Sequence, residues 1–419
     1  MTATDTNRVI DAVWRIESPK LIAGLARMTR DVGLAEELAQ DALVAALERW
    51  PETGVPDNPG AWLMAAAKNR AVDRLRRAKR AEEKHAEIGR DMAAEQATVP
   101  DFDTALDDDI GDDLLRLIFT ACHPVLSTDA RVALTLRLLG GLTTGEIARA
   151  FLVPEPTMAQ RIVRAKRTLA EAKVGFEVPR RDELEARLSS VLEVIYLIFN
   201  EGYAATAGED WMRPQLCEEA LRLGRVLAGL APDEPEVHGL VALMELQMSR
   251  FAARTGPDGE PILLLDQNRA RWDQLLIRRG LTALLRAESL AKPAGPYVLQ
   301  AAIAACHARA GTADETDWPR IAALYRVLGT IAPSPVVELN RAVAVAMAEG
   351  PAAGLEILDA LRDEPALKSY HLLPAVRGDL LEKLGRHAEA RAEFERAAAM
   401  AQNARERAVL AGRATAIGT

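Results

Sequence analysis

The spacing of apolar residues constrains the fold more than any other feature of this sequence. Apolar side chains recur at i, i+3 and i+4 along almost the whole chain, and alternation of apolar and polar residues is nearly absent. This period gathers apolar side chains on one face of an α-helix, whereas a strand requires a period of two. Alanine, leucine, arginine and glutamate dominate, and aromatic residues make up only 4%. The sequence therefore predicts an all-α protein.

The distribution of charge divides the chain into parts. Seven cations and one anion lie between Lys68 and Arg80, whereas residues 82–113 contain twelve acids and two cations. An acidic stretch without a sustained apolar face is typical of a tether between domains. A chain of 419 residues is also long for one domain. We expect a helical domain over 7–81, an acidic linker over 82–113, a second helical domain over 114–175, and a helical extension over 180–419.

Composition excludes several classes of function. The net charge of −9 argues against nucleic-acid binding by the whole surface, so any DNA contact requires a local basic patch. Cys122, Cys217 and Cys306 lie far apart, without metal-ligand spacing, which predicts neither a disulfide scaffold nor a metal site. The sequence has no signal peptide, no membrane-spanning run and none of the common catalytic motifs. We expect a soluble cytoplasmic protein that is not an enzyme and needs no cofactor.

Residues 142–169 contain the sharpest local signal. Thr143 and Glu146 have the spacing of a capping box, which predicts a helix start. Pro156 suits the first turn of a following helix. In that helix Met158, Ile162, Ala165 and Leu169 form an apolar stripe at i+4, i+3 and i+4. Two short helices joined by a tight turn predict a helix-turn-helix whose second helix enters the DNA major groove. The alternative is a pair of packed helices with a solvated basic face.

A second basic helix is predicted over residues 59–80. Asn58 can cap its first turn and Pro59 can occupy its first position. We expect its inner face to consist of Trp62, Ala65, Val72 and Leu75. By itself such a helix is most often solvated, because basic helix ends favour the helix dipole. Two basic helices on either side of an acidic tether instead favour contact with two DNA segments.

In the long C-terminal part, proline and glycine residues separate short segments with helical spacing. This pattern is typical of an α-solenoid. Around Leu384-Gly385, small residues at 390 and 397 and Phe394 resemble the second half of a tetratricopeptide (TPR) repeat. Near its start stand Asn200, Glu201 and Tyr203, which are candidates for a regulatory contact. The alternative, which we favour, is that Gly202 caps the preceding helix and its neighbours satisfy backbone ends.

Residues 7–172 resemble an extracytoplasmic-function (ECF) sigma factor of bacterial RNA polymerase. The resemblance rests on AEELAQDALVAALERW (35–50), PGAWLMAAAKNRAVDRLRR (59–77) and the helix-turn-helix, in this order and separated by the acidic linker. It implies a sigma-2 and a sigma-4 domain that bind core polymerase at the β′ clamp and the β flap, and that bind promoter DNA. The resemblance, over residues 7–172, covers about 40% of the chain.

The resemblance also implies roles for individual residues. Helix 35–50 would bind the β′ clamp through Glu36, Glu37, Leu38, Gln40, Asp41 and Leu43. The −10 promoter element would be opened by Asn58, Lys68, Asn69, Arg70, Arg74 and Arg77, with Trp50 and Trp62 more suited to the core than to base stacking. The −35 element would be bound by Thr157, Gln160, Arg161, Arg164, Lys166 and Arg167, with Gln160 and Arg161 facing base edges.

Segment 194–206 is similar to the start of the TPR-like extension that defines one group of ECF factors. This similarity implies a regulatory tail in place of a membrane anti-sigma partner, and a small DGPF/YCII-type protein as a partner. Another hypothesis stays open: a stand-alone helix-turn-helix regulator with a helical-repeat sensor or protein-binding domain. Residues 35–77 discriminate between the two, because such a regulator has no reason to carry them.

Overall fold

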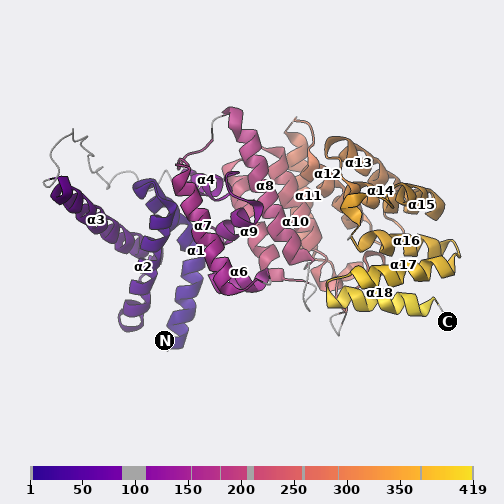
Figure 1. Ribbon diagram of the computed structural model, residues 1–419, viewed down its shortest axis with the longest axis horizontal. Coiled ribbons are helices and arrows are strands. Elements are labelled where there is room, and N and C mark those ends of the chain that lie inside the picture. Colours follow the sequence, from indigo (N-terminus) through magenta and orange to yellow (C-terminus); the bar gives the residue numbers. More distant parts are fainter. Residues whose placement is uncertain are drawn as a thin grey trace. The chain divides into compact units, whose positions relative to one another are not determined.

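The fold is shown by a computed structural model (Figure 1). It describes residues 3–86, 110–151, 153–179, 181–204, 212–256, 260–290, 292–368 and 370–417. Across these ranges the secondary structure is helical, and an isolated bridge between Thr255 and Pro261 is the one β-type pairing. The predicted all-α class is therefore confirmed. The chain divides into two compact units, Met1–Val194 and Ile195–Thr419, and the boundary falls inside helix α8.

The first unit contains two groups of helices and the start of α8. The first module comprises α1 (Ala3–Thr29), α2 (Val32–Thr53) and α3 (Pro59–Ala86). The second module comprises α4 (Ile110–Ala121), α5 (Thr128–Leu138), α6 (Thr144–Ala150) and α7 (Glu155–Glu171). Helix α8 (Arg181–Tyr203) begins in the first unit and continues past its boundary at Val194. Residues 87–109 of the predicted acidic linker lie outside the described residues.

The three helices of the first module pack against one another around an alanine-rich core. Asp31 starts α2, because its side chain accepts a hydrogen bond from the Leu34 amide at 3.0 Å. Trp50 is 1% exposed and its ring meets the edge of Trp62 at 5.3 Å, so Trp50 belongs to the core. Buried alanines on both helices let α1 and α2 approach closely.

The predicted inner face of α3 is wrong. Its buried residues are Leu63, Ala67 and Ala71, whereas Ala65 is exposed and Trp62 and Val72 are half-buried. The side chain of Leu75 lies outside the described residues. The observed stripe repeats at i+4, whereas the predicted residues are spaced by three, seven and three, so the buried face is rotated around the helix. Alanines offer several equivalent apolar stripes, and packing against α1 and α2 selects one of them.

The second unit consists of consecutive helices, each of which packs on its neighbours in the chain. The α-helices are α9 (Pro214–Leu230), α10 (Pro235–Met248), α11 (Gln274–Ser289), α12 (Pro296–Arg309), α13 (Trp318–Ile331), α14 (Pro335–Glu349), α15 (Pro351–Ala360), α16 (Leu372–Lys383), α17 (His387–Met400) and α18 (Ala404–Ala416). The short 3-10 turns are η1 (Phe251–Ala253), η2 (Leu264–Asp266), η3 (Arg269–Arg271) and η4 (Pro365–Leu367).

Leucine and alanine build the cores of the second unit. Leu246, Leu284 and Ala305 meet in one cluster of buried residues, and Phe394, Ala397 and Leu410 meet in another. Gly378 lies so close to the ring of Phe394 that an added Cβ would stand 3.1 Å from it. The TPR-like residues near the end of the chain thus pack as their spacing predicts. Of the helices within the described residues, none combines the length and apolarity needed to cross a membrane.

Candidate nucleic-acid interface

The helix-turn-helix is formed by α6 and α7, and its predicted capping box is confirmed. The amide of Thr143 donates to Glu146 Oε2 at 2.8 Å, and the amide of Glu146 donates to Thr143 Oγ1 at 3.2 Å. These reciprocal bonds satisfy two amides that a helix start would otherwise leave unpaired. Pro156 lies in the first turn of α7, where its missing N–H costs nothing.

The two faces of α7 divide as the sequence predicts. Met158, Ile162, Ala165 and Leu169 are at most 5% exposed, and they face α5 and α6. Thr157, Gln160, Arg164 and Arg167 are exposed. Arg161 is half-buried and lies 3.3 Å from Asp129, and Arg167 pairs with Glu171 one turn later at 2.9 Å. The exposed face can therefore donate hydrogen bonds to base edges and phosphates.

The candidate polymerase-binding residues on α2 fall into two groups. Glu37 and Asp41 are exposed, and Gln40 and Leu43 are half-buried. Glu36 and Leu38 are 3% and 1% exposed, so neither offers its side chain to solvent in this arrangement. Residues two positions apart point to nearly opposite sides of a helix, so Glu36 and Leu38 are covered from different sides of α2, and the Glu36 side faces Arg137 of α5 and Lys166 of α7.

Glu36 joins the two modules of the first unit. Its carboxylate accepts from Arg137 Nε of α5 at 2.6 Å and from Lys166 Nζ of α7 at 2.9 Å. Gln40 donates to the same carboxylate at 2.6 Å. Burial by itself would raise the pKa of Glu36, but the positive charges of Lys166 and Arg137 outweigh it and hold the pKa below its usual range. Glu36, a candidate polymerase contact, is thus paired with Lys166, a candidate contact of the −35 DNA.

Two further ion pairs link the same modules. Arg15 of α1 lies 2.9 Å from Glu146 of α6. Arg27 of α1 lies 3.1 Å from Asp113 of α4, whose carboxylate is almost fully buried. Oppositely charged groups of the two modules therefore meet at three separate places, in addition to the packing of α1 against α4.

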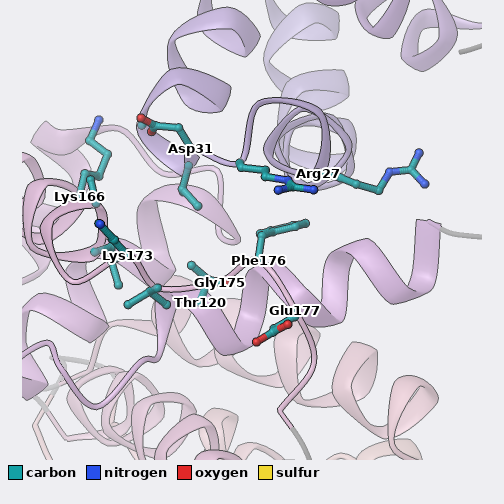
Figure 2. Close-up of a pocket in the computed structure, with 14 residues that line it drawn as sticks. Arg27, Asp31, Thr120, Lys166, Lys173, Gly175, Phe176 and Glu177 are labelled. Atoms are coloured by element: carbon teal, nitrogen blue, oxygen red, sulfur yellow. The ribbon is translucent and has the colours of Figure 1, made fainter. Parts of the chain in front are cut away.

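A polar crevice of about 700 Å³ lies between the modules (Figure 2). In Figure 2, Lys166 and Lys173 lie on one side of it and Arg27 lies on the other. Arg30 and Lys173 adopt positive φ angles of 53° and 49°, which non-glycine residues rarely do. Arg30 follows the end of α1 and Lys173 follows the end of α7, and both residues line the crevice. The crevice is one part of the contact between the modules, and α1 also packs directly against α4.

The candidate −10 residues lie on and just before α3. Asn58 caps this helix, as predicted, by accepting from the Ala61 amide at 3.1 Å. Arg74 pairs with Glu37 at 3.1 Å, and Arg70 lies 3.8 Å from Asp41. Lys68 is half-buried and Asn69 is exposed, whereas the side chain of Arg77 lies outside the described residues. The basic face of α3 is therefore close to the acidic face of α2.

The remaining candidates lie in the C-terminal half of α8. Asn200 is exposed, Glu201 pairs with Arg213, and the Tyr203 hydroxyl donates to Gln247 at 2.9 Å. The expected capping role of Gly202 is wrong, because this residue is within α8. An added Cβ at Gly202 would meet the Cys217 amide at 2.8 Å, so glycine is required there by close packing against α9.

Sequence reasoning missed the residues that join the modules. Arg137 had only one signal, a cation in the last turn of a helix. Glu36 is an acid within an alanine-rich helix, which does not indicate that it is buried. Neither pattern specifies a partner that lies about a hundred residues away.

The fold and these surfaces define a class of protein. One helical module carries basic and acidic faces on adjacent helices, and a second presents a helix-turn-helix with an exposed basic face, as in proteins that recognise DNA at two places. The sigma-70 region 2 family matches residues 14–81, and the sigma-70 region 4 family matches residues 116–169. Residues 187–288 match a family of unknown function, DUF6596.

Curated proteins similar to this chain include one uncharacterized protein and two named as ECF sigma factors. The uncharacterized protein R00370 of Rhizobium meliloti is 43% identical over 97% of this chain and 95% of its own length. The probable ECF RNA polymerase sigma factor SigI of Mycobacterium tuberculosis is 27% identical over 40% of this chain and 57% of its own length. The ECF RNA polymerase sigma factor SigK of Mycobacterium ulcerans is 30% identical over 35% and 75%. No solved structure matches.

The chain belongs to the ECF sigma factors, and it carries a helical C-terminal extension that includes the DUF6596 segment. The recognition made from the motifs alone is thereby confirmed.

Proposed function

We propose that this protein binds core RNA polymerase through α2, opens the −10 element with α3 and the segment before it, and binds the −35 element through α7. The observation that carries this proposal is the exposed face of α7, on which Gln160, Arg164 and Arg167 stand opposite a fully buried apolar stripe. Such a helix can enter a major groove without disturbing its own core.

The acidic face of α2 suits a basic partner. Glu37 and Asp41 are exposed, and the only cations near them are the exposed Arg74 and Arg70 among the described ion pairs. Pairs between solvated side chains contribute little and exchange easily. A basic surface on the polymerase can therefore replace Arg70 and Arg74, which frees them for the single strand of the −10 element.

Glu36 makes the two functions depend on each other. The Lys166 side chain is 22% exposed and its charge is paired with Glu36, which weakens its contact with a DNA phosphate, and α2 cannot present Glu36 to the polymerase while α5 and α7 cover it. Binding of either partner thus competes with the contact between the modules. We propose that the free protein is held closed by this contact and that polymerase and promoter open it together.

The C-terminal extension is proposed to regulate this activity. It is tethered to the DNA-binding modules through α8, and a tether provides a high effective concentration without tight intrinsic affinity. Whether the extension activates or inhibits transcription is measured by comparing the full-length protein with a shortened one.

Run-off transcription with purified core polymerase on a promoter library tests the proposal. The full-length protein is compared with Gln160→Ala and Arg164→Gln, which remove groups from the exposed face of α7 and leave its buried stripe intact. Promoter-specific transcripts that depend on both residues are the expected result. A variant that ends at Val194, where the first unit ends, reports the sign of the regulation by the extension.

The matched control is Arg278→Gln, an exposed arginine of α11 in the second unit. It should leave transcription unchanged. Failure of the full-length protein to bind core polymerase, together with tight binding to free promoter DNA, would overturn the proposal in favour of a stand-alone helix-turn-helix regulator.

A further inference from the structure

The second unit contains a cavity of about 740 Å³ that promoter recognition does not use. Segment 261–266 lines one part of it, and residues of α14, α16, α17 and α18 line the rest. The helices α16, α17 and α18 pack side by side at the C-terminal end of the chain (Figure 1). We call this space the leucine cavity. The DUF6596 segment ends at residue 288, so the cavity joins that segment to helices that follow it.

The leucines of segment 261–266 are not covered by other parts of the unit. Leu263 is 51% exposed and Leu265 is 38% exposed, and both line the cavity. The Ile262 amide donates to the Arg254 carbonyl at 2.8 Å, which fixes the backbone of the segment. The chain thus holds large apolar side chains beside an open space. Exposed apolar surface that gathers in one place marks a site for a ligand or a partner.

The helices that face this segment present aliphatic side chains. Leu372, Val376 and Leu380 follow one another at i+4 along α16, and Val409 of α18 lies beside them in the lining. Met347 of α14 adds an unbranched side chain that can adapt to the shape of a ligand. Aliphatic walls offer neither ring stacking nor hydrogen bonds. They therefore favour a molecule that gains by leaving water, which is one with an aliphatic body.

The cations of the lining are already paired with acids. Asp379 of α16 lies 2.9 Å from Lys383 and 3.0 Å from Arg413 of α18. Arg413 also lies 2.5 Å from Glu382. A negatively charged ligand would have to compete with these carboxylates for the same two cations, and it would lose its own hydration on entering.

The remaining charged groups of the lining do not call for a cation. Glu406 lies 3.3 Å from Nε2 of His371, and its charge also acts on the buried Arg254. Asp266 is exposed and therefore hydrated. A positively charged ligand would gain little from these acids and would pay the cost of losing water in an aliphatic space. The charges of the lining thus favour an uncharged occupant.

The size of the cavity favours a small molecule over a segment of protein. Cavities that bury most of a small organic ligand measure roughly 300–1,000 Å³. A helix is about 10 Å across with its side chains, so two turns occupy about 850 Å³, which is more than this space holds. An extended peptide would bring backbone N–H and C=O groups that aliphatic walls leave without hydrogen bonds.

We propose that the leucine cavity binds an uncharged aliphatic small molecule of the class of medium-chain alcohols. Its aliphatic body lies between segment 261–266 and the apolar stripe of α16, and its hydroxyl group stays near the charged residues of the lining. Binding removes the leucines of both walls from water, which is its main source of affinity. The C-terminal extension is then a sensor of such a molecule, a function that does not require the sigma activity.

Fluorescence titration of the full-length protein with N-phenyl-1-naphthylamine, an uncharged apolar dye, tests this proposal. We expect saturable binding with one site per chain and displacement of the dye by 1-decanol. Leu263→Gln and Leu372→Gln, which change opposite walls, should each raise the Kd of the dye at least fivefold. Both side chains are more than a third exposed, so both variants should fold, which circular dichroism verifies.

The matched control is Leu285→Gln. Leu285 is 59% exposed on α11 and lies outside the lining of the cavity, so the Kd should stay unchanged. Binding that does not saturate, or a Kd that is equal in the wild type and in both variants of the walls, would overturn the proposal. These measurements involve neither polymerase nor DNA, so their outcome is independent of the proposed sigma function.

Competition by three molecules with the same ten-carbon chain tests the charge of the ligand. We expect 1-decanol to displace the dye at a lower concentration than decanoate or decylamine does. Displacement at a lower concentration by either charged molecule would contradict the assignment of an uncharged ligand.

A further variant covers the case in which the leucine variants do not fold. Met347→Trp places a large ring in the cavity from a half-buried position, and it should weaken dye binding at least fivefold. Unchanged affinity in the folded Met347→Trp variant would count against the proposal. Sedimentation tests another occupant: a wild-type dimer that dissociates in Leu263→Gln would assign the cavity to a second copy of the chain and would overturn the small-molecule assignment.

Discussion

The contacts between helices differ between the two units of this protein. In the first unit, α2 meets α5 and α7 through the carboxylate of Glu36, which is held by Arg137 and Lys166. In the second unit, α10, α11 and α12 meet through Leu246, Leu284 and other apolar side chains that are almost fully buried. The first kind of contact depends on charge complementarity and the second on the removal of apolar surface from water.

This difference determines which contacts can open. A buried ion pair gains Coulomb energy but gives up the hydration of both charges, so its net contribution is small even when its geometry is good. DNA phosphates and a charged partner can replace each half of the pair, whereas nothing in water replaces a leucine core. We therefore expect the modules of the first unit to separate during function while the helices of the second unit stay packed.

The largest effect is expected in an apolar core of the second unit. Phe394 is fully buried between α16, α17 and α18, with Arg413 over its ring at 4.3 Å. Phe394→Ala should lower the free energy of unfolding by roughly 3–5 kcal/mol, because it leaves a cavity that rigid helices fill poorly. Urea unfolding followed by circular dichroism measures the change.

Val327→Ala is the control for this prediction, since Val327 is 49% exposed on α13. It should change the free energy of unfolding by less than about 0.5 kcal/mol. Equal effects of the two variants would show that the second unit has no core of the kind described.

The next effect is expected at the contact between the modules. Glu36→Gln keeps the size of the side chain but leaves Arg137 and Lys166 without their carboxylate. It should destabilise the first unit by on the order of 2 kcal/mol, since it leaves two partly buried cations unpaired. The midpoint of urea unfolding measures this loss, and Glu48→Gln on the exposed face of α2 is the matched control.

The same variant has a second readout, in DNA binding. Release of Lys166 should add one phosphate contact, so the slope of log affinity against log salt should steepen by about one unit. Filter binding to a −35 duplex at several salt concentrations measures this slope. An unchanged slope with lowered stability would mean that Glu36 has a structural role only.

The pH dependence of the contact follows from the lowered pKa of Glu36. A carboxylate whose pKa is lower in the folded state contributes stability above its unfolded pKa and loses it as the pH falls through the folded pKa. The modules should therefore separate on acidification. Val44 of α2 and Val163 of α7 are both exposed and can carry fluorophores. In the wild type, the energy transfer between them should decrease as the pH is lowered. In Glu36→Gln it should be low at every pH.

The smallest effect on stability is expected at the exposed pair between α2 and α3. The side chains of Glu37 and Arg74 are 59% and 57% exposed, so Arg74→Gln should cost less than about 1 kcal/mol of unfolding free energy. The same substitution should reduce opening of the −10 element, measured by permanganate reactivity of the promoter with polymerase. Arg49→Gln, an exposed arginine of α2, should change neither quantity.

Local structure followed from the sequence where short-range chemistry decides it. The capping box of Thr143 and Glu146, the proline in the first turn of α7 and the cap at Asn58 involve residues within three positions of each other. The buried stripe from Met158 to Leu169 could also be predicted from the sequence, because its apolar residues recur at i+4, i+3 and i+4 among polar and charged ones. The face of α3 was not readable in this way, since most of its apolar residues are alanines that suit several orientations.

What the sequence determined by itself is the all-α class, the helix-turn-helix with its outer face, and the membership in the ECF sigma factors. These features rest on periodicity, capping and motif order, all of which are local along the chain. Only the tertiary structure decided that Glu36 is buried between Arg137 and Lys166, that Gly202 allows a close approach of α9, and that Arg250 and Arg269 both lie over the ring of Trp272. The physical reason is that the energy of a charge depends on its burial and its neighbours in space, which residues a hundred positions away supply.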